Sequence, residues 1–428
     1  MNWDFLIKDK DSLCVSTDTR NLPAGCVFFA LHGERFDGNK FAKQALESGA
    51  SLAVIDNPEY ALPEGTLLVP NTLLALQDLA RAWRRELGLP IIGITGTNGK
   101  TTTKELLATV LSTKYNLHYT QGNLNNQIGV PLTLLQITRA HELAIVEMGA
   151  SHPGDIKELV DIAEPNYGLI TNVGRAHLEG FGSFEGVQRT KQELYDYLVA
   201  HQGTIFRNTD NPYLASMHDS ALASSPHRLI ASSPISNSPQ SGRPIAADAA
   251  SNNRLVAYAT GTMPSGTHLV GEYNAENVSA AMSVGEHFGV SRELALDAIR
   301  QYVPTNNRSQ AMQTANNQLI VDAYNANPTS MQAAINAFKG DTYILGAMRE
   351  LGEYSHLEHQ NIVNMLAERK ADTVFLVGEE YLRTTSPYPV FENVELLHNY
   401  LEEQPLKGKN ILLKGSRSTK MEKLLDVL

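Results

Sequence analysis

A glycine-rich loop that ends in lysine and threonine carries the strongest chemical signal in the sequence. It covers residues 93–103, follows an apolar run at 91–94 and leads into a helical pattern. In this context backbone N–H groups and a helix N-terminus surround a phosphate. The lysine would reach the outer phosphates of a nucleotide, and the first threonine hydroxyl would bind Mg²⁺. The residues that we expect to bind the nucleotide here are Gly96, Thr97, Asn98, Gly99, Lys100, Thr101 and Thr102.

The loop departs from the strict phosphate-binding pattern at one position. That pattern has glycine where this chain has Ile94. The alternative interpretation is a strand-to-helix turn that binds no ligand. Such a turn does not need Lys100 followed by Thr101, so we favour the phosphate site.

Two side chains that could bind a metal follow later apolar runs. Glu147 comes directly after residues 143–146, and His177 comes shortly after 169–170. A glutamate after a strand is often a cap or turn residue, and a single histidine is often structural. Carboxyl ends of parallel strands meet at one edge of a sheet. Both side chains could therefore lie beside Thr101 as metal ligands.

The central part of the chain alternates apolar runs with helical patterns. Such alternation predicts a mostly parallel sheet with helices on both faces. Ligands bind such sheets at the carboxyl ends of the strands, which is where the polar residues lie. The expected strands are 91–94, 143–146, 169–170 and 204–206, and the expected helices are 101–111, 155–162, 190–198 and 276–288.

Two further α/β units flank this central one. A small unit of short strands and a helix comes first and ends with a helix at 73–87, closed by Gly88 and Pro90. A second doubly wound sheet comes last. We expect domains at 1–88, 89–303 and 304–428. The expected outer elements are strands 27–31, 51–55, 319–321, 343–345, 374–377 and 411–413, and helices 41–48, 331–338 and 356–368.

Composition restricts the partners of the chain. Its net charge of -11 argues against general binding of nucleic acid or anionic membrane, because phosphate binding needs a basic surface. No signal peptide or membrane-spanning run is apparent, so we expect a cytoplasmic protein without membrane insertion. Cys14 and Cys26 show no metal spacing, and we expect two reduced, semi-buried thiols and no disulfide framework. Residues 216–253 are rich in Ser, Ala, Pro and Asn, which predicts an irregular surface segment.

Several motifs together resemble those of the Mur ligases over nearly the whole chain. The phosphate loop is the first, and the run 322–328, with its Tyr-Asn-Ala-Asn-Pro sequence, is the most specific. That run is more similar to the branch of the family that adds D-alanyl-D-alanine than to branches that add one amino acid. The other matching segments are 16–20, 33–41, 120–133, 146–154, 171–174 with His177 after it, 271–277, 345–346, 350–352 with His359 after it, and 414–418.

The resemblance implies a three-domain α/β fold and an ATP-dependent ligation. The fold would comprise a small N-terminal nucleotide-binding domain, a central P-loop ATPase domain with a parallel sheet, and a C-terminal Rossmann-like domain. ATP would phosphorylate the carboxylate of UDP-N-acetylmuramoyl-tripeptide, and the amine of D-alanyl-D-alanine would attack the acyl phosphate. This would be the last cytoplasmic step in assembling the peptidoglycan pentapeptide precursor. We expect a monomer that needs ATP and Mg²⁺.

The resemblance also implies a role for individual residues. Catalytic groups would be Lys100, Glu147, His177 and Lys191, and metal ligands would be Thr101, Glu147, His177 and Lys191. Lys191 would be carbamylated, because an ammonium would repel Mg²⁺ whereas a carbamate resembles a carboxylate. The nucleotide would also contact Asn274, Asn277, Arg308 and Asp322. The other substrates would contact Thr17, Arg20, Asp37, Gly38, Asn123, Asn125, Asn126, Tyr324, Asn325, Asn327, Lys414, Gly415, Ser416 and Arg417.

Three positions depart from the family pattern. Tyr273 stands where histidine is usual, Ala323 where a second aspartate is frequent, and Arg308 where glycine is common. None of them removes a phosphate-binding or metal-binding group, so the departures bear on adenosine binding. Two other functions remain open from the sequence. One is an amide ligase of the Mur or folylpolyglutamate type that adds a single amino acid, and the other is a nucleotide-binding regulator without catalysis.

Overall fold

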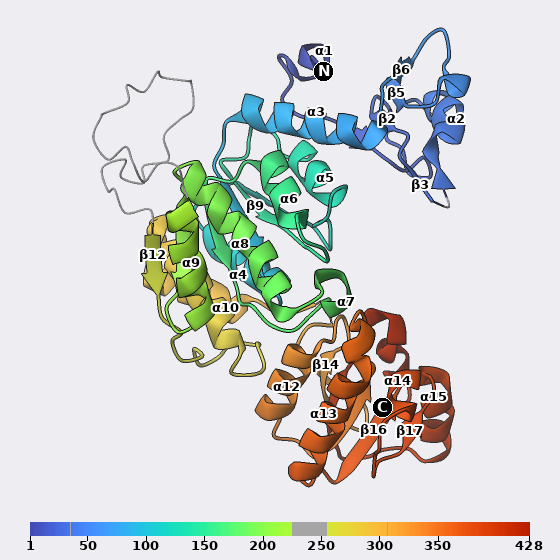
Figure 1. Ribbon diagram of the computed structural model, residues 1–428, viewed down its shortest axis with the longest axis vertical. Helices are drawn as coiled ribbons and strands as arrows, with labels where there is room; N and C mark the ends of the chain where they lie inside the picture. Colours follow the sequence, from blue (N-terminus) through green and yellow to red (C-terminus); the bar gives the residue numbers. More distant parts are fainter. Residues whose placement is uncertain (35, 225–254, 306) are drawn as a thin grey trace.

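The chain folds into three α/β units that follow one another in sequence and in space (Figure 1). The computed structural model describes residues 1–34, 36–224, 255–305 and 307–428. The central unit lies between the other two (Figure 1). We name the units N-terminal, central and C-terminal after their main sheets, which span residues 15–68, 91–258 and 310–414.

The N-terminal unit is built on a four-stranded parallel sheet with the order β1-β2-β5-β6. Phe28 and Ile55 pack in a small hydrophobic core that is separate from the others and also includes Ala42 and Ala45 of helix α2. The expected strands and helix are confirmed, each within a few residues. The elements are α1 (Asp4–Ile7), β1 (Val15–Ser16), β2 (Val27–Phe29), the hairpin β3 (His32–Gly33) and β4 (Phe36–Asp37), α2 (Ala42–Glu47), β5 (Leu52–Ile55) and β6 (Thr66–Leu68).

The two cysteines of this unit correct the expectation of reduced thiols. Cys14 and Cys26 form a disulfide, with their Cα atoms 4.5 Å apart. They come just before the paired strands β1 and β2, and the Val27 N–H donates a hydrogen bond to the Cys14 carbonyl. Strand pairing therefore brings the two thiols together, which their spacing in the sequence does not reveal.

Helix α3 (Thr72–Leu87) connects the N-terminal unit to the central one and confirms the helix expected at 73–87. Asn71 caps its first turn by accepting a hydrogen bond from the Leu74 N–H at 2.8 Å. Trp83 is fully buried and donates through Nε1 to the Ile137 carbonyl at 2.8 Å. The helix therefore packs on the central unit as well as leading into it (Figure 1).

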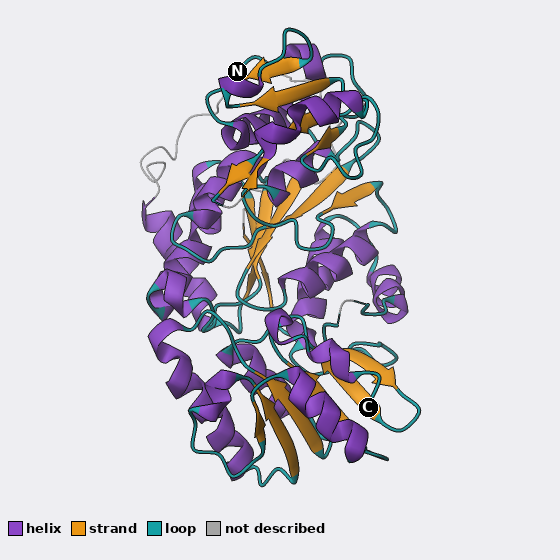
Figure 2. Cartoon of the chain, turned by 90° about the vertical axis from the view of Figure 1, so that its right-hand side faces the viewer, coloured by secondary structure: helices purple, strands orange, loops and turns teal. Residues whose placement is uncertain are grey.

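The central sheet has six parallel strands in the order β12-β11-β10-β7-β9-β8. Its strands are drawn in orange in the middle of the molecule, with helices around them (Figure 2). This confirms the expected parallel sheet, and it adds β8 and β12 at the two edges. The strands are β7 (Ile91–Thr95), β8 (Leu117–Tyr119), β9 (Leu143–Glu147), β10 (Tyr167–Ile170), β11 (Thr204–Asn208) and β12 (Leu255–Tyr258). The helices are α4 (Lys100–Leu111), α5 (Gly129–Leu135), α6 (Asp155–Ala163), α7 (Leu178–Phe181), α8 (Phe184–Ala200), α9 (Pro212–Ser224), α10 (Asn274–His287) and α11 (Arg292–Gln301).

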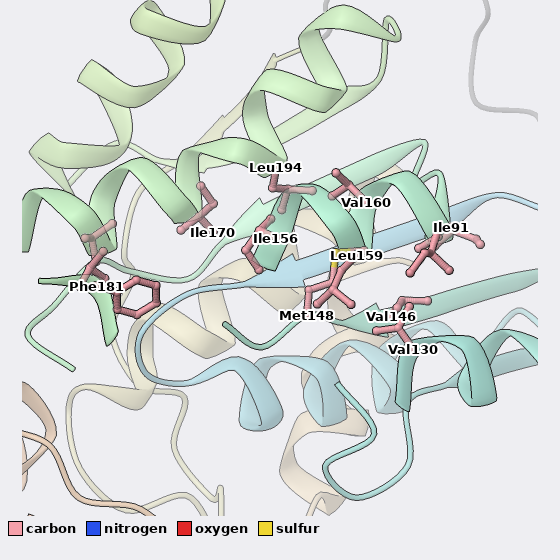
Figure 3. Packing of buried hydrophobic residues seen from close by; sticks show 14 of the residues in the cluster. Ile91, Val130, Val146, Met148, Ile156, Leu159, Val160, Ile170, Phe181 and Leu194 are labelled. Atoms are coloured by element: carbon pink, nitrogen blue, oxygen red, sulfur yellow. The ribbon is translucent and has the colours of Figure 1, made fainter. Parts of the chain in front are cut away.

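Helices cover both faces of the central sheet. On one face Leu194 of α8 lies next to Ile156 and Leu159 of α6 and to Met148 (Figure 3). On the other face Leu107 of α4 belongs to a separate buried cluster with side chains of α10 and α11. Each such buried aliphatic side chain contributes about 1.5–3 kcal/mol relative to an exposed one. The carboxyl edge of the sheet is thus held between two well-packed layers.

Part of the segment expected to be irregular is helical. Helix α9 includes residues 216–224, and its Met217 and Ala221 are buried. The helical spacing of its apolar residues is hard to recognise in the sequence, because small residues such as Ser216 and Ser220 lie between them. Residues 225–253 of that prediction lie outside the described residues.

The C-terminal unit has a six-stranded sheet with the order β13-β14-β18-β15-β16-β17, in which only β13 is antiparallel. The four expected strands are confirmed, and β13 and β17 extend the sheet at its edges. The strands are β13 (Gln310–Gln313), β14 (Gln318–Asp322), β15 (Thr342–Gly346), β16 (Thr373–Val377), β17 (Val390–Phe391) and β18 (Asn410–Lys414). The helices are α12 (Pro328–Ala337), α13 (Ser355–Glu368), α14 (Glu379–Leu382) and α15 (Val394–Glu403).

None of the helices in the described residues is long and apolar enough to cross a membrane.

Candidate active site

A cavity of about 840 Å³ lies where the central and C-terminal units meet. Its walls come from the phosphate loop, the ends of β9 and β10, the start of α10, and the loops after β14 and β18. Many residues that the sequence singles out converge here. Those that line the cavity are Thr97, Asn98, Gly99, Lys100, Thr101, Thr102, Asn123, Asn125, Asn126, Glu147, His177, Asn274, Asn277, Arg308, Asp322, Tyr324, Asn325, Asn327, Lys414, Ser416 and Arg417.

The phosphate loop is held open by contacts with the end of β10. The Thr97 N–H donates to the Asn172 carbonyl at 2.9 Å, and the Asn98 N–H donates to Asn172 Oδ1 at 3.0 Å. Gly96 has a φ of +146°, and a Cβ atom there would lie 2.0 Å from Thr171 Oγ1. The loop therefore needs glycine at this position both for its backbone conformation and for its close approach to β10.

Lys100 begins α4 and is folded back on the loop. Its Nζ donates hydrogen bonds to the carbonyls of Gly96 at 2.7 Å and Thr97 at 3.1 Å. Burial lowers the pKa of Lys100 to about 8, although the nearby Glu147 carboxylate acts in the opposite direction. Its ammonium is therefore charged at neutral pH and lies at the loop where phosphates would bind.

Thr101 and Glu147 meet at the base of the cavity. Thr101 Oγ1 donates to Glu147 Oε2 at 3.0 Å, and Asn125 Nδ2 donates to Oε1 at 2.8 Å. The Glu147 N–H donates to Thr120 Oγ1 at 3.0 Å. A hydroxyl and a carboxylate oxygen so close together suit Mg²⁺, which prefers oxygen ligands and binds few protein groups. The donor set therefore fits this ion.

His177 and Lys191 each contact residues other than Thr101 and Glu147. His177 has a φ of +51° and its Nδ1 contacts Glu350 of the C-terminal unit. Lys191 is 2% exposed, with its ammonium 5.5 Å from the centroid of the Phe181 ring, and it does not line the cavity. Within the described ranges, no group of three or more His, Cys, Asp or Glu side chains could hold a metal.

The environment of Lys191 disfavours its ammonium form. Burial lowers the pKa of Lys191 well below its ordinary value, and the charge of Lys100 lowers it further. A neutral amine is the form of lysine that reacts with CO₂. The side chain is thus buried in surroundings that favour its reactive form.

Helix α10 borders the cavity, with its first residues turned towards the phosphate loop. Asn277 Oδ1 accepts from Thr103 Oγ1 at 3.0 Å, and Asn277 Nδ2 donates to Asn274 Oδ1 at 2.8 Å. Asn274 Nδ2 donates to the Val270 carbonyl at 2.7 Å, and Tyr273 forms a 2.5 Å hydrogen bond with Ser309. These amides are occupied by protein partners and fix α10 against the helix that follows the loop.

The C-terminal unit contributes an ion pair and two arginines that lie over one tyrosine ring. Lys414 is 1% exposed and donates to Asp322 Oδ2 at 2.5 Å and to the Asn325 carbonyl at 3.1 Å. The guanidinium carbons of Arg308 and Arg417 lie 3.8 Å and 5.6 Å from the centroid of the Tyr324 ring. Positive groups from this unit therefore face the phosphate loop across the cavity.

The candidates of the N-terminal unit lie apart from this cavity. Asp37 lines a second hollow of about 700 Å³ together with His32, Asn39 and Asp56. Arg20 forms an ion pair with Asp18 at 2.5 Å. Thr17, Arg20 and Gly38 line neither hollow, and Gly96, Lys191 and Gly415 do not line the main one. The structure therefore does not bring the predicted residues of the N-terminal unit into the main cavity.

Several residues at the main cavity had no assigned role in the sequence. Arg349 and Glu350 line it from the C-terminal unit, and Gln127 and Asp155 from the central unit. Gln127 Nε2 donates to Asp155 Oδ1 at 3.1 Å. Gln127 and Glu350 lie inside segments that match the family, so those segments were the available signal. Asp155 carried no signal of a role at the cavity, because an acidic residue at the start of a helix is usual.

Three family models together match most of the chain. The Mur ligase middle domain matches residues 94–285. The glutamate ligase domain of Mur ligases matches 307–417, and the catalytic domain of the Mur ligase family matches 14–84. The three matches follow the order of the three sheets.

Curated relatives and solved structures agree with these models. The UDP-N-acetylmuramoyl-tripeptide–D-alanyl-D-alanine ligase of Bacillus subtilis (strain 168) is 34% identical, over 97% of this chain and 92% of that protein. The enzyme of the same name from Escherichia coli (strain K12) is 33% identical, over 97% and 93%. The crystal structure of MurF from Acinetobacter baumannii has a TM-score of 0.78 and 29% identity, covering 96% of this chain and 92% of that one.

Proposed function

The chain belongs to the Mur ligase family, and we propose that it joins D-alanyl-D-alanine to UDP-N-acetylmuramoyl-tripeptide at the expense of ATP. The observation that carries the proposal is the similarity to enzymes of this activity along 97% of the chain. The convergence of central and C-terminal side chains on one cavity supports it. The product would be the pentapeptide precursor of peptidoglycan, and we expect the enzyme to work as a cytoplasmic monomer.

The proposed reaction has two bond-forming steps. An oxygen of the tripeptide carboxylate attacks the γ-phosphorus of ATP, and ADP leaves. The amine of the dipeptide then attacks the acyl carbon, loses a proton, and phosphate leaves. The first step brings the negative charges of the carboxylate and the γ-phosphate together, and the second develops negative charge on the acyl oxygen and the leaving phosphate. Positioning and electrostatic stabilisation would therefore supply most of the catalysis.

The side chains in the cavity suit these demands. Lys100 would stabilise charge on the transferred phosphate, with the loop amides around the other phosphates. Asn274 and Asn277 would shape the adenosine side, where they already fix α10. Arg308 and Asp322 would contact the ribose and phosphates, and Asn123, Asn125 and Asn126 the tripeptide carboxylate. Tyr324, Asn325, Asn327, Lys414, Gly415, Ser416 and Arg417 would bind the incoming dipeptide.

Mg²⁺ would be held by Thr101 and Glu147, whose oxygens lie 3.0 Å apart. When bound, the ion would neutralise phosphate charge as the carboxylate attacks. His177 would join only after leaving Glu350, which it contacts now. The substrate nucleotide would lie on the N-terminal unit, near Thr17, Arg20, Asp37 and Gly38.

Carbamylation of Lys191 is part of the proposal and has its own test. A carbamate would turn a buried amine, whose pKa the charge of Lys100 lowers, into an anionic group that could act on the metal. Intact-mass spectrometry at neutral pH with bicarbonate should show an added CO₂, which Lys191→Ala should lack. Unmodified Lys191 in active, magnesium-loaded enzyme would refute this part alone.

Phosphate release is the direct test of the proposed reaction. With ATP, Mg²⁺ and UDP-N-acetylmuramoyl-tripeptide, release should require D-alanyl-D-alanine and should not occur with D-alanine or D-glutamate. Lys100→Ala should lower the rate by a factor of about 10²–10³, as expected for loss of a group that stabilises the transition state. Release with a different amine would mean that the chain is a ligase with another amine substrate. No release with any pairing would refute the proposal.

A further inference from the structure

Lys104 is a buried cation that the proposed reaction does not use. It lies on α4 one helical turn after Lys100, and its side chain is 1% exposed. Its Nζ is 3.7 Å from Glu147 Oε2 and 5.9 Å from the centroid of the Tyr119 ring. Lysine is almost never fully buried without a partner. The carboxylate of Glu147, which forms the ion pair, and the charge of Glu105 therefore stabilise this ammonium inside the protein.

Glu147 depends on Lys104 in return. Its side chain is 2% exposed, and the hydrogen bonds that it accepts come from the hydroxyl of Thr101 and the amide of Asn125. These donors are neutral, so they orient the carboxylate without cancelling its charge. An isolated buried carboxylate is costly, and an ion pair offsets that cost.

The position of Lys104 leaves the cavity side of Glu147 free for a ligand. Residues three and four apart share one face of a helix, so Thr101 and Lys104 both reach Glu147 from α4. Thr101 and Glu147 line the cavity, whereas Lys104 does not. The ammonium thus stands behind the carboxylate, and the hydroxyl stands beside it.

We propose that Lys104 is a positioning residue that acts as the permanent counter-ion of Glu147. It balances the carboxylate whenever no divalent cation is bound, and it keeps the oxygens beside Thr101, where a cation would bind. The inference rests on the proposed function, because it takes Glu147 to be a ligand of Mg²⁺.

The proposal predicts a stability loss that depends on the metal. Without Lys104 the Glu147 carboxylate loses its ion-pair partner while the charge of Lys100 remains nearby, and bound Mg²⁺ would offset the loss. A lysine that only filled space would contribute equally with and without the metal. The dependence on Mg²⁺ therefore separates a counter-ion from a packing residue.

The experiment measures thermal unfolding of Lys104→Met, which keeps most of the length of the side chain and removes the charge. In EDTA we expect its melting temperature to fall by roughly 5–10 °C below wild type. With Mg²⁺ and a non-hydrolysable ATP analogue, we expect the deficit to shrink to less than half. Lys114→Met is the matched control, because Lys114 follows α4, donates to the carbonyls of Phe288 and Gly289, and lies 5.4 Å from the centroid of the Tyr115 ring. Its deficit should be the same in both buffers.

A double variant gives a second measurement. Lys104→Met with Glu147→Gln leaves no charge in the pair, so in EDTA its melting temperature should exceed that of Lys104→Met and should gain little from Mg²⁺. The double variant can still be measured if Lys104→Met alone does not fold. Equal deficits of Lys104→Met in both buffers, or a double variant less stable than either single variant, would overturn the proposal.

Failure of the proposed function would look different. Wild type would then gain no more stability from the nucleotide with Mg²⁺ than from the nucleotide in EDTA, and the counter-ion role would fail together with the metal site. If wild type does gain from Mg²⁺ while the deficit of Lys104→Met stays constant, only the role of Lys104 is refuted.

Discussion

At the scale of single residues, the protonation of Lys100 links pH to nucleotide binding. Burial holds its pKa at about 8, well below the ordinary value of 10.5. Between these two pH values the unfolded chain binds more protons than the folded one, so this lysine makes stability rise with pH across that window. The charged form, which costs stability below pH 8, is the form that an anionic nucleotide needs.

Nucleotide binding should therefore take up protons at alkaline pH. Anionic phosphates raise the pKa of the lysine, so ADP binding at pH 8.5 should take up roughly 0.5–0.8 proton more than at pH 6.5, where Lys100 is already charged. Isothermal titration calorimetry in two buffers of different ionisation enthalpy measures this uptake. The same uptake at both pH values would contradict the assignment of Lys100 to the phosphates.

The aromatic ring of Tyr324 contacts two arginine side chains of the cavity. Because Arg308 and Arg417 both lie over this ring, Tyr324→Leu should loosen two cations that face the phosphate loop. A loss of about 1–2 kcal/mol would raise KM for ATP or the dipeptide roughly 5- to 30-fold. Tyr324→Phe keeps the ring and should stay near wild type in steady-state kinetics. Equal effects of the two substitutions would point to the hydroxyl instead.

At the scale of elements, the loop before α5 depends on Gly129. A Cβ atom there would lie 2.3 Å from the backbone of Leu124, inside the loop that carries Asn123 and Asn125. Gly129→Ala should displace this loop, destabilise the protein by about 1–3 kcal/mol and weaken ligation. Denaturant unfolding and initial rates measure the two effects. Gly261→Ala, where the nearest atom would be 3.6 Å away, is the control and should change neither.

At the scale of the whole molecule, few polar contacts link the central and C-terminal units near the cavity. Arg175 donates to the buried carboxylate of Glu358 at 2.7 Å, and the side chains of Asn98 and Asn327 bond to each other at 2.8 Å. The Arg175 N–H also donates to Thr329 Oγ1 at 2.9 Å. One of these contacts starts in the phosphate loop itself, so nucleotide binding and the placement of the C-terminal unit are physically linked.

Loss of Arg175 should loosen this arrangement. Arg175→Met leaves the Glu358 carboxylate buried without its cation, at a cost of about 1–3 kcal/mol, since the arginine is itself half exposed. We expect a larger radius of gyration in small-angle X-ray scattering and a higher KM. The double variant Arg175→Met with Glu358→Gln should recover much of the wild-type radius of gyration and of the wild-type KM. Arg300→Met, which breaks an exposed pair within α11, should leave the scattering unchanged.

Local patterns in the sequence determined most elements of the fold. Strand β7, the phosphate loop and α4 follow from one apolar run, its glycines and the helical spacing after them. Two kinds of element among those that were missed show why local patterns did not find them. Edge strands such as β8 and β17 are too short for a pattern, and helices α11 and α15 have narrow apolar faces among many polar residues. Their formation depends on the units that they pack against.

Only the tertiary structure decided which distant groups meet. The loop, the candidate ligands and the family could be inferred from the sequence, because each is a local run of residue types. The pairing of Thr101 with Glu147, the contact of His177 with Glu350 and the disulfide of Cys14 with Cys26 could not. These contacts depend on strand order, register and the placement of one unit on another. Such features arise from packing over the whole chain, and sequence spacing does not encode them.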